Sequence, residues 1–208
     1  MFSTIAKPVD AQTYATMNRS EAMSAIVAVR YLHEPVSGAL AGPVGTESGA
    51  SVLAFLAQDA EGQVFCYSNA DLTRADQNGE LMRFVEFWHT VTGTDPQWLY
   101  FDSKVVDYPE LSRVNQRNIF FVTIRRRGAA IVRDLERQPT SAWKTAVIDI
   151  PKRCHVHVRY IASTVRLRGY DGPLRQIAVA GLGREQPTLV LSNNFEQTPR
   201  DLIIRYAG

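Results

Sequence analysis

The apolar positions of this chain change period several times, and each change predicts a new element of secondary structure. Two apolar runs flank the sequence Asp-Ala-Glu-Gly in residues 51–70, which predicts a β-hairpin. Apolar residues then recur three and four positions apart in residues 79–91, which predicts an amphipathic helix that ends at Gly93. The helix face that we expect to pack on a sheet carries Leu81, Phe84, Val85 and Trp88.

A strand–helix–strand unit follows this helix. Residues 98–101, Trp-Leu-Tyr-Phe, form an apolar run typical of a buried strand. Residues 108–118 predict a short helix with Leu111 and Val114 facing inward, and residues 119–124 predict the next strand. Because strands alternate with helices over this part of the chain, we expect an α/β protein with a mixed or parallel sheet.

The pattern changes again in the second half. Residues 136–185 hold short, β-branched and basic runs, which predict antiparallel strands without helices. Residues 186–208 add one apolar run and a helix that begins with Thr198 as N-cap and Pro199 in the first position. We therefore predict an α/β core in residues 51–135, a β-rich insertion in residues 136–185 and a return to the core in residues 186–208.

Residues 1–50 do not share this organisation, and we treat them as a separate N-terminal segment and linker. Residues 19–32 begin with Arg-Ser-Glu and predict a helix, whereas residues 36–50 are rich in Gly, Ala, Ser and Pro. No apolar run reaches the length of a membrane span or follows the basic leader of a signal peptide. Cys66 and Cys154 form no CxxC pair, so we expect a cytoplasmic protein.

Charge is divided unevenly, although the chain of 208 residues has a net charge of only +2. Residues 1–102 contain 5 Lys and Arg against 12 Asp and Glu, a net charge of −7. Residues 103–208 contain 18 against 9, a net charge of +9. A basic half of this size predicts a polyanionic partner such as nucleic acid. The alternative is a solvated basic surface that only confers solubility.

One acid stands directly at the end of an apolar strand. Asp102 follows Trp-Leu-Tyr-Phe and precedes Ser103 and Lys104. An Asp in this position often caps the next helix or shapes a turn. The alternative is a metal ligand, because α/β proteins place their chemistry at the carboxyl ends of the strands. The neighbouring residues leave both interpretations open.

A family resemblance rests on several segments in a fixed order: "VLAFLAQD", "YSNADLTRADQ", "ELMRFVEFW", "LYFDSKV", "FVTIRRRG" and "PTLVLSNN". Over residues 51–208 the chain resembles the catalytic region of bacterial DDE transposases of the insertion-sequence type. The resemblance implies an RNase H-like mixed sheet interrupted by a β-rich insertion that contacts transposon-end DNA. It is strongest at Phe55–Asp59, Tyr67–Gln77, Leu99–Val105, Phe121–Gly128 and Pro187–Asn193.

In this family three carboxylates hold two divalent ions for phosphoryl transfer on DNA, and Mg²⁺ suits that work. Asp102 matches the second carboxylate, so the resemblance implies that Asp102 is a catalytic and metal-binding residue. The first would precede "VLAFLAQD", where residues 36–50 offer no match, while Asp59 and Asp71 fit turn or loop positions better. The glutamate would follow "RYA", where the sequence ends at Gly208.

We therefore expect a transposase-type chain that is truncated at both ends and does not carry out strand transfer alone. Arg125–Arg127 follow a strand that we expect beside the Asp102 strand, and arginines pair readily with phosphates. Other basic residues decorate the β-rich insertion. The complete set of candidate DNA contacts is Lys104, Arg125, Arg126, Arg127, Lys152, Arg153, Arg159, Arg166 and Arg168.

Four hypotheses follow from these observations. The first is a transposase remnant that still binds DNA, and the second is an intact unit whose missing carboxylates come from another chain. The third is a non-catalytic nucleic-acid-binding protein built on the same basic domain, and the fourth is a plain soluble α/β domain. The expected partners are DNA at transposon ends, with a homodimer as a further possibility, and no membrane.

Overall fold

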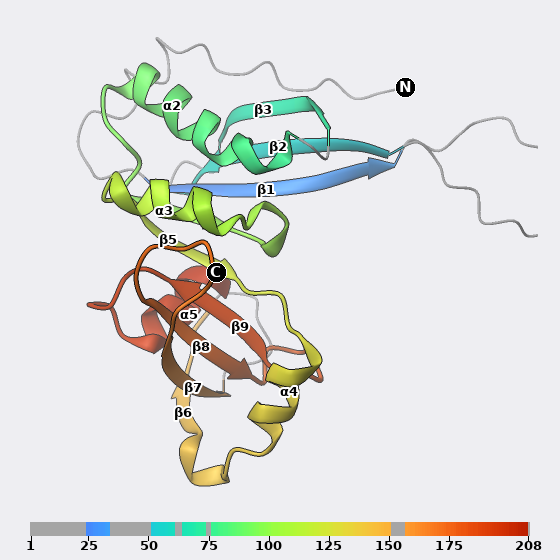
Figure 1. The fold of residues 1–208 in the computed structure, drawn as a ribbon, viewed down its shortest axis with the longest axis vertical. Helices are drawn as coiled ribbons and strands as arrows, with labels where there is room; N and C mark the ends of the chain where they lie inside the picture. Colours follow the sequence, from blue (N-terminus) through green and yellow to red (C-terminus); the bar gives the residue numbers. More distant parts are fainter. Residues whose placement is uncertain (1–23, 34–50, 61–63, 74–75, 151–156, 208) are drawn as a thin grey trace, which may run out of the picture.

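A computed structural model describes residues 24–33, 51–60, 64–73, 76–150 and 157–207 of the chain (Figure 1). The strands among these residues form one nine-stranded sheet in the order β3-β2-β1-β4-β5-β9-β8-β7-β6. The strands are β1 (Ser24–His33), β2 (Ser51–Asp59), β3 (Phe65–Leu72), β4 (Trp98–Phe101), β5 (Phe120–Ile124), β6 (Lys144–Val147), β7 (His157–Val165), β8 (Leu174–Ala180) and β9 (Thr188–Ser192). The α-helices are α2 (Glu80–Thr92), α3 (Tyr108–Gln116), α4 (Ala129–Glu136) and α5 (Pro199–Ala207).

The strands β3, β2, β1, β4 and β5 make up what we call the first arm of the sheet. β2 pairs antiparallel with β1 and β3, which confirms the predicted hairpin. β1, β4 and β5 run parallel, with Ser24 opposite Trp98 and Trp98 opposite Phe120. Parallel neighbours need a crossover connection, and α3 supplies one between β4 and β5. The expectation of a mixed α/β sheet is confirmed.

The helix predicted for residues 19–32 is wrong, because residues 24–33 form the strand β1. This strand is central in the first arm, with β2 on one side and β4 on the other. Its sequence is rich in the β-branched residues Ile26, Val27 and Val29, which favour strands. A strand between two others reads as a continuous apolar run, and such a run cannot be told from a helix by its period alone.

The strands β9, β8, β7 and β6 make up the second arm, and every neighbouring pair in it is antiparallel. This confirms the antiparallel strands predicted for the β-rich region. β9 joins the arms, because it pairs with both β5 and β8. The helix α4 was not predicted; it precedes β6 and contains no buried residue. One sheet runs through the segments predicted as core, insertion and return. The division of the chain into these three segments stays a prediction.

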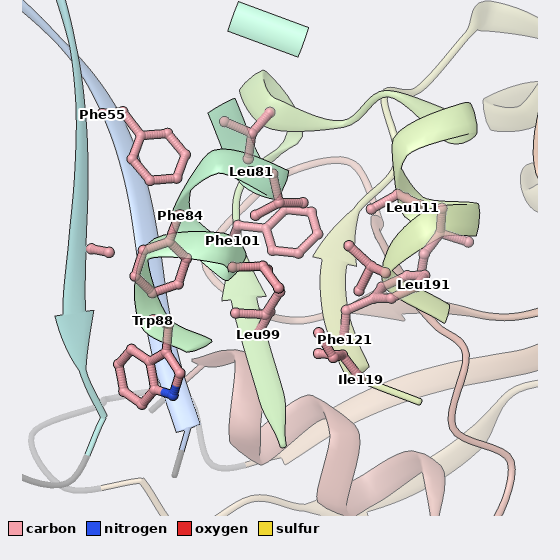
Figure 2. Packing of buried hydrophobic residues seen from close by; sticks show 14 of the residues in the cluster. Phe55, Leu81, Phe84, Trp88, Leu99, Phe101, Leu111, Ile119, Phe121 and Leu191 are labelled. Carbon is pink, nitrogen blue, oxygen red and sulfur yellow. The ribbon is translucent and has the colours of Figure 1, made fainter. Parts of the chain in front are cut away.

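Two apolar clusters cover the two faces of the sheet. The first joins α2 and α3 to the first arm, and Figure 2 shows side chains of α2 and β4 pointing toward each other. The predicted packing face of α2 is confirmed, because Leu81, Phe84, Val85 and Trp88 are all buried there. The second cluster packs α5 against the opposite face; it includes Trp98, Tyr100, Val122, Val190, Leu202 and Ile203.

The last helix begins as the sequence predicts. The hydroxyl of Thr198 accepts a hydrogen bond from the backbone N–H of Asp201 at 3.2 Å, and Pro199 occupies the first helical position. At its other end Arg205 donates to the hydroxyl of Tyr100 at 2.8 Å. In the described part of the chain, no helix is long and apolar enough to span a membrane.

Candidate functional site

Asp102 lies at the carboxyl end of β4, beside the carboxyl end of β5. The parallel register of the two strands sets Asp102 level with Ile124. The hydroxyl of Thr123 donates to the backbone carbonyl of Asp102 at 3.4 Å and ties the strand ends together. The prediction that the two strands lie side by side is confirmed. Arg125–Arg127 follow the end of β5 at the same sheet edge as Asp102.

The carboxylate of Asp102 caps a short helix. Its Oδ1 accepts a hydrogen bond from the backbone N–H of Lys104 at 2.6 Å, which makes Asp102 the N-cap of the 3₁₀ helix η2 (Ser103–Val105). Short polar side chains commonly satisfy free amides in this way. The cap interpretation of this residue is confirmed, while its role as a metal ligand stays a prediction.

Asp102 also lines a hollow of about 310 Å³. Segments far apart in the sequence meet there, because Arg184 comes from the β8–β9 connection and Tyr206 from the last turn of α5. Sequence reasoning did not assign either residue to the site: Arg184 stands in no motif, and "RYA", which contains Tyr206, served only to locate the expected glutamate. The full lining is Asp102, Ser103, Ile124, Leu182, Arg184, Thr188, Tyr206 and Ala207.

The other candidate acids lie elsewhere in the sheet. Asp59 pairs with Ala25, which is opposite Leu99, three residues before Asp102 and two strands away. Asp71 lies on β3, with β2 and β1 between it and β4. At about 4.8 Å per strand, Asp71 is about 14 Å from the Asp102 strand. Neither acid reaches the site.

The residues at this edge do not fit the two Mg²⁺ ions that the resemblance implies. Two-metal chemistry needs several carboxylates around the ions. Within the described ranges, no three His, Cys, Asp or Glu residues group closely enough to hold a metal ion. β1, the neighbour of β4, contains neither Asp nor Glu. Arg184 lines the same hollow as Asp102, and Lys104 follows Asp102 by two residues, so positive charge near this carboxylate disfavours a cation.

Two of the three consecutive arginines make internal contacts. Arg125 donates to Gln176 Oε1 on β8 at 2.6 Å. Arg127 donates to the backbone carbonyls of Gln186 and Pro187 at 2.9 and 3.0 Å. These bonds fasten the segment after β5 to the second arm. Arg126, between them, is exposed.

Arg126 lines a second hollow, of about 250 Å³, on the other side of Ser103. Lys104 lines the same hollow, so the structure brings two of the predicted DNA contacts together. Tyr108 and Gln77, which sequence reasoning did not single out, form other walls. The full lining is Gln77, Asn78, Ser103, Lys104, Val106, Tyr108 and Arg126.

The remaining basic candidates fall in three places. Arg166 and Arg168 are exposed on the β7–β8 connection, whose Gly169 packs closely against Tyr108 and Pro109 at the start of α3. Arg159 is on β7, where its guanidinium lies 5.7 Å from the ring centre of Trp143. The predicted contacts Lys152 and Arg153 lie outside the described residues.

Two buried carboxylates, one at the start of α2 and one on α3, also escaped sequence reasoning. Glu80 accepts a hydrogen bond from the hydroxyl of Tyr67 at 2.7 Å and pairs with Arg83 at 3.0 Å. Glu110 of α3 accepts one from the backbone N–H of Met82 at 3.0 Å. Burial raises the pKa of Glu110 to about 7. Both carboxylates hold α2 against its neighbours, because Glu80 bonds to β3 and Glu110 reaches α2 from α3.

Comparisons with known proteins assign no family, because no family model and no curated protein matches the chain. One similar solved structure is the catalytic domain of human endonuclease V, with 10% identity over 89% of this chain and 74% of that chain and a TM-score of 0.39. A second structure of human endonuclease V gives 9% identity over 88% and 74%, with a TM-score of 0.37. At such scores the likeness assigns neither a fold family nor an activity to this chain.

Proposed function

We propose that this chain is a transposase-type DNA-binding protein with an RNase H-like core, related to DNA transposition or recombination. The observation that carries the proposal is the gathering of Lys104 and Arg126 around one hollow at the Asp102 edge. Cations at the carboxyl ends of parallel strands are well placed for the phosphates of a nucleic acid. The positive half of the chain adds attraction at longer range.

The order of elements supports the RNase H-like assignment. β2, β3, α2, β4, α3 and β5 follow one another as strand, strand, helix, strand, helix and strand. This is the order on which the resemblance to the transposase core rests. Asp102 ends the strand after the first crossing helix, where the family has its second aspartate.

The alternative is a non-catalytic nucleic-acid-binding protein on the same basic domain. One observation favours it: the Asp102 carboxylate is engaged by the amide of Lys104 instead of by a cluster of acids. A preference for transposon-end sequences over other duplexes would distinguish the transposase-type protein from this alternative. Equal affinity for all duplexes would favour the alternative.

A titration of duplex DNA with the purified chain, followed by mobility shift at about 50 and 200 mM salt, tests DNA binding. Each phosphate neutralised contributes about 0.9 to the slope of log affinity against log salt, so affinity should fall steeply. Changing Arg125, Arg126 and Arg127 to Ala together should weaken binding. Circular dichroism must show that this variant folds, since Arg125 and Arg127 also hold internal contacts.

Substitution of other exposed cations separates local contacts from overall charge. Arg133→Ala in α4 and Lys144→Ala in β6 remove exposed cations that line neither hollow. We expect these variants to bind nearly as well as the unchanged chain. Absence of any DNA complex at the lower salt concentration would rule out the proposed function.

A further inference from the structure

The 250 Å³ hollow differs in chemistry from the metal centre that the resemblance implies. Its lining contains Lys104 and Arg126 and no Asp or Glu. The other polar groups in the lining are the hydroxyls of Ser103 and Tyr108 and the amides of Gln77 and Asn78. Ammonium, guanidinium, hydroxyl and amide groups all donate hydrogen bonds, and phosphate oxygens accept them. The hollow is therefore suited to an anion.

The wall that carries Lys104 is held on two sides. The side chain of Gln77, in the 3₁₀ helix η1 (Gln77–Gly79), donates to the backbone carbonyl of Lys104. The backbone N–H of the same residue donates to Asp102 at 2.6 Å. These two bonds fix the Lys104 backbone between η1 and the end of β4. A site whose backbone is fixed before binding loses less entropy when the ligand arrives.

Arg126 is positioned by its neighbours. Arg125 and Arg127 are fastened to the second arm by three hydrogen bonds, so the short segment between them has little freedom. The exposed Arg126 side chain lines the hollow from this fixed base. Within the described residues no carboxylate pairs with Arg126, so its charge is not neutralised by an ion pair. Two cations from two separate segments thus line one hollow.

The neighbouring 310 Å³ hollow adds one negative charge to this edge, that of Asp102. Asp102 lines the 310 Å³ hollow together with one cation, Arg184. The Asp102 carboxylate is also occupied by the amide of Lys104. The residues that line the two hollows include three cations and one acid, a composition that favours an anion over a divalent cation in these hollows.

We propose that the hollow between Lys104, Arg126 and Tyr108 is a metal-independent subsite for a phosphate group of the nucleic-acid backbone. The inference rests on the proposed function, because that function supplies the phosphate. The inference adds to the proposed function the position of one phosphate and the expectation that binding needs no divalent ion. A free phosphate shares the same chemistry, and the experiment separates the two sources.

The experiment uses the full chain with Lys104→Gln, Arg126→Gln and the double variant, against Lys144→Gln and Arg133→Gln as controls. Affinity for a duplex oligonucleotide is measured by fluorescence anisotropy over a series of salt concentrations, with EDTA and with Mg²⁺. We expect each site variant to weaken binding several-fold and to lower the salt slope by about 1, and the double variant by about 2. EDTA should change nothing, and the controls should behave like the unchanged chain.

A second arm of the experiment uses inorganic phosphate, detected by NMR shifts of backbone amides. Shifts at Ser103 and Lys104 that vanish in the double variant support the subsite even if DNA does not bind, but then its ligand is free phosphate and the nucleic-acid source is overturned. DNA binding that survives unchanged in the double variant overturns the subsite while the proposed function stands. Loss of DNA binding in EDTA overturns its independence of metal.

Discussion

The two arms of the sheet are built from similar strands but are covered differently. In the first arm all four residues of β4 are buried, since α2 and α3 pack on one face and α5 on the other. In the second arm α5 covers one face, but β6 has no buried residue and β7 has one. The first arm is therefore a packed core, and the second presents exposed side chains at its edge.

Arginine plays a different part beside the first arm and at the junction of the two arms. In the first arm Arg117 pairs with Asp95 and Glu86, so its charge is balanced. Where the two arms meet, Arg127 after β5 and Arg175 on β8 donate to backbone carbonyls, which satisfy the hydrogen bonds but leave the positive charge. Hydrogen bonding and charge neutralisation are therefore separate. The basic half can use arginines for structure and still attract a polyanion.

The largest contrast should appear when a phenylalanine is removed from each arm. Phe84→Ala opens a cavity in the packed cluster under α2, where Phe84 is fully buried, and should cost about 3–5 kcal/mol. Phe195→Ala, after β9, removes a ring that is 46% exposed and should cost less than about 1 kcal/mol. Urea denaturation measures both. Equal losses would show that the second arm is as tightly packed as the first.

The buried carboxyl of Glu110, at the contact between α2 and α3, should make the free energy of unfolding depend on pH. The folded-state pKa of Glu110 is raised to about 7 from 4.5 because the carboxyl is buried. The folded protein therefore holds this proton more tightly than the unfolded chain, and stability falls as pH rises from about 4.5 to 7. The total loss is about 3 kcal/mol, and it persists above pH 7.

Glu110→Gln tests this expectation, because glutamine keeps an oxygen for the amide of Met82 and carries no charge. The variant should be more stable than the unchanged chain at pH 8 and equally stable near pH 4. Thermal melting across this range measures the difference. Glu136→Gln on the exposed helix α4 is the matched control and should leave the profile unchanged. A variant that is less stable at pH 8 would contradict the assigned cause.

The smallest effects are expected at Asp102. Asp102→Ala should cost about 1 kcal/mol through loss of the cap on Lys104. Nicking of labelled transposon-end DNA with Mg²⁺ or Mn²⁺ should be absent in the unchanged chain and remain absent in the variant, since one carboxylate cannot hold two cations. Cleavage that disappears in Asp102→Ala would show that other ligands reach this edge.

Much of the first arm could be predicted because its signals are local. The buried face of α2 follows from apolar residues three and four positions apart, and the cap at Thr198 follows from one residue and its helix. The candidate site was predicted in part. Asp102 and Arg126 stand next to recognisable strands, whereas Arg184 lies in an irregular connection that no pattern marks.

The sequence by itself determined the alternation of strands and helices, the direction of the α2 face and the concentration of positive charge after Asp102. Those features depend on periodicity and composition, which neighbouring residues encode. Only the tertiary structure decided that residues 24–33 form a strand, that Asp59 and Asp71 stay away from Asp102, and that Arg126 and Lys104 line one hollow. Each of these depends on pairing between distant segments, and the energy of such pairing comes from neighbours that the local sequence does not contain.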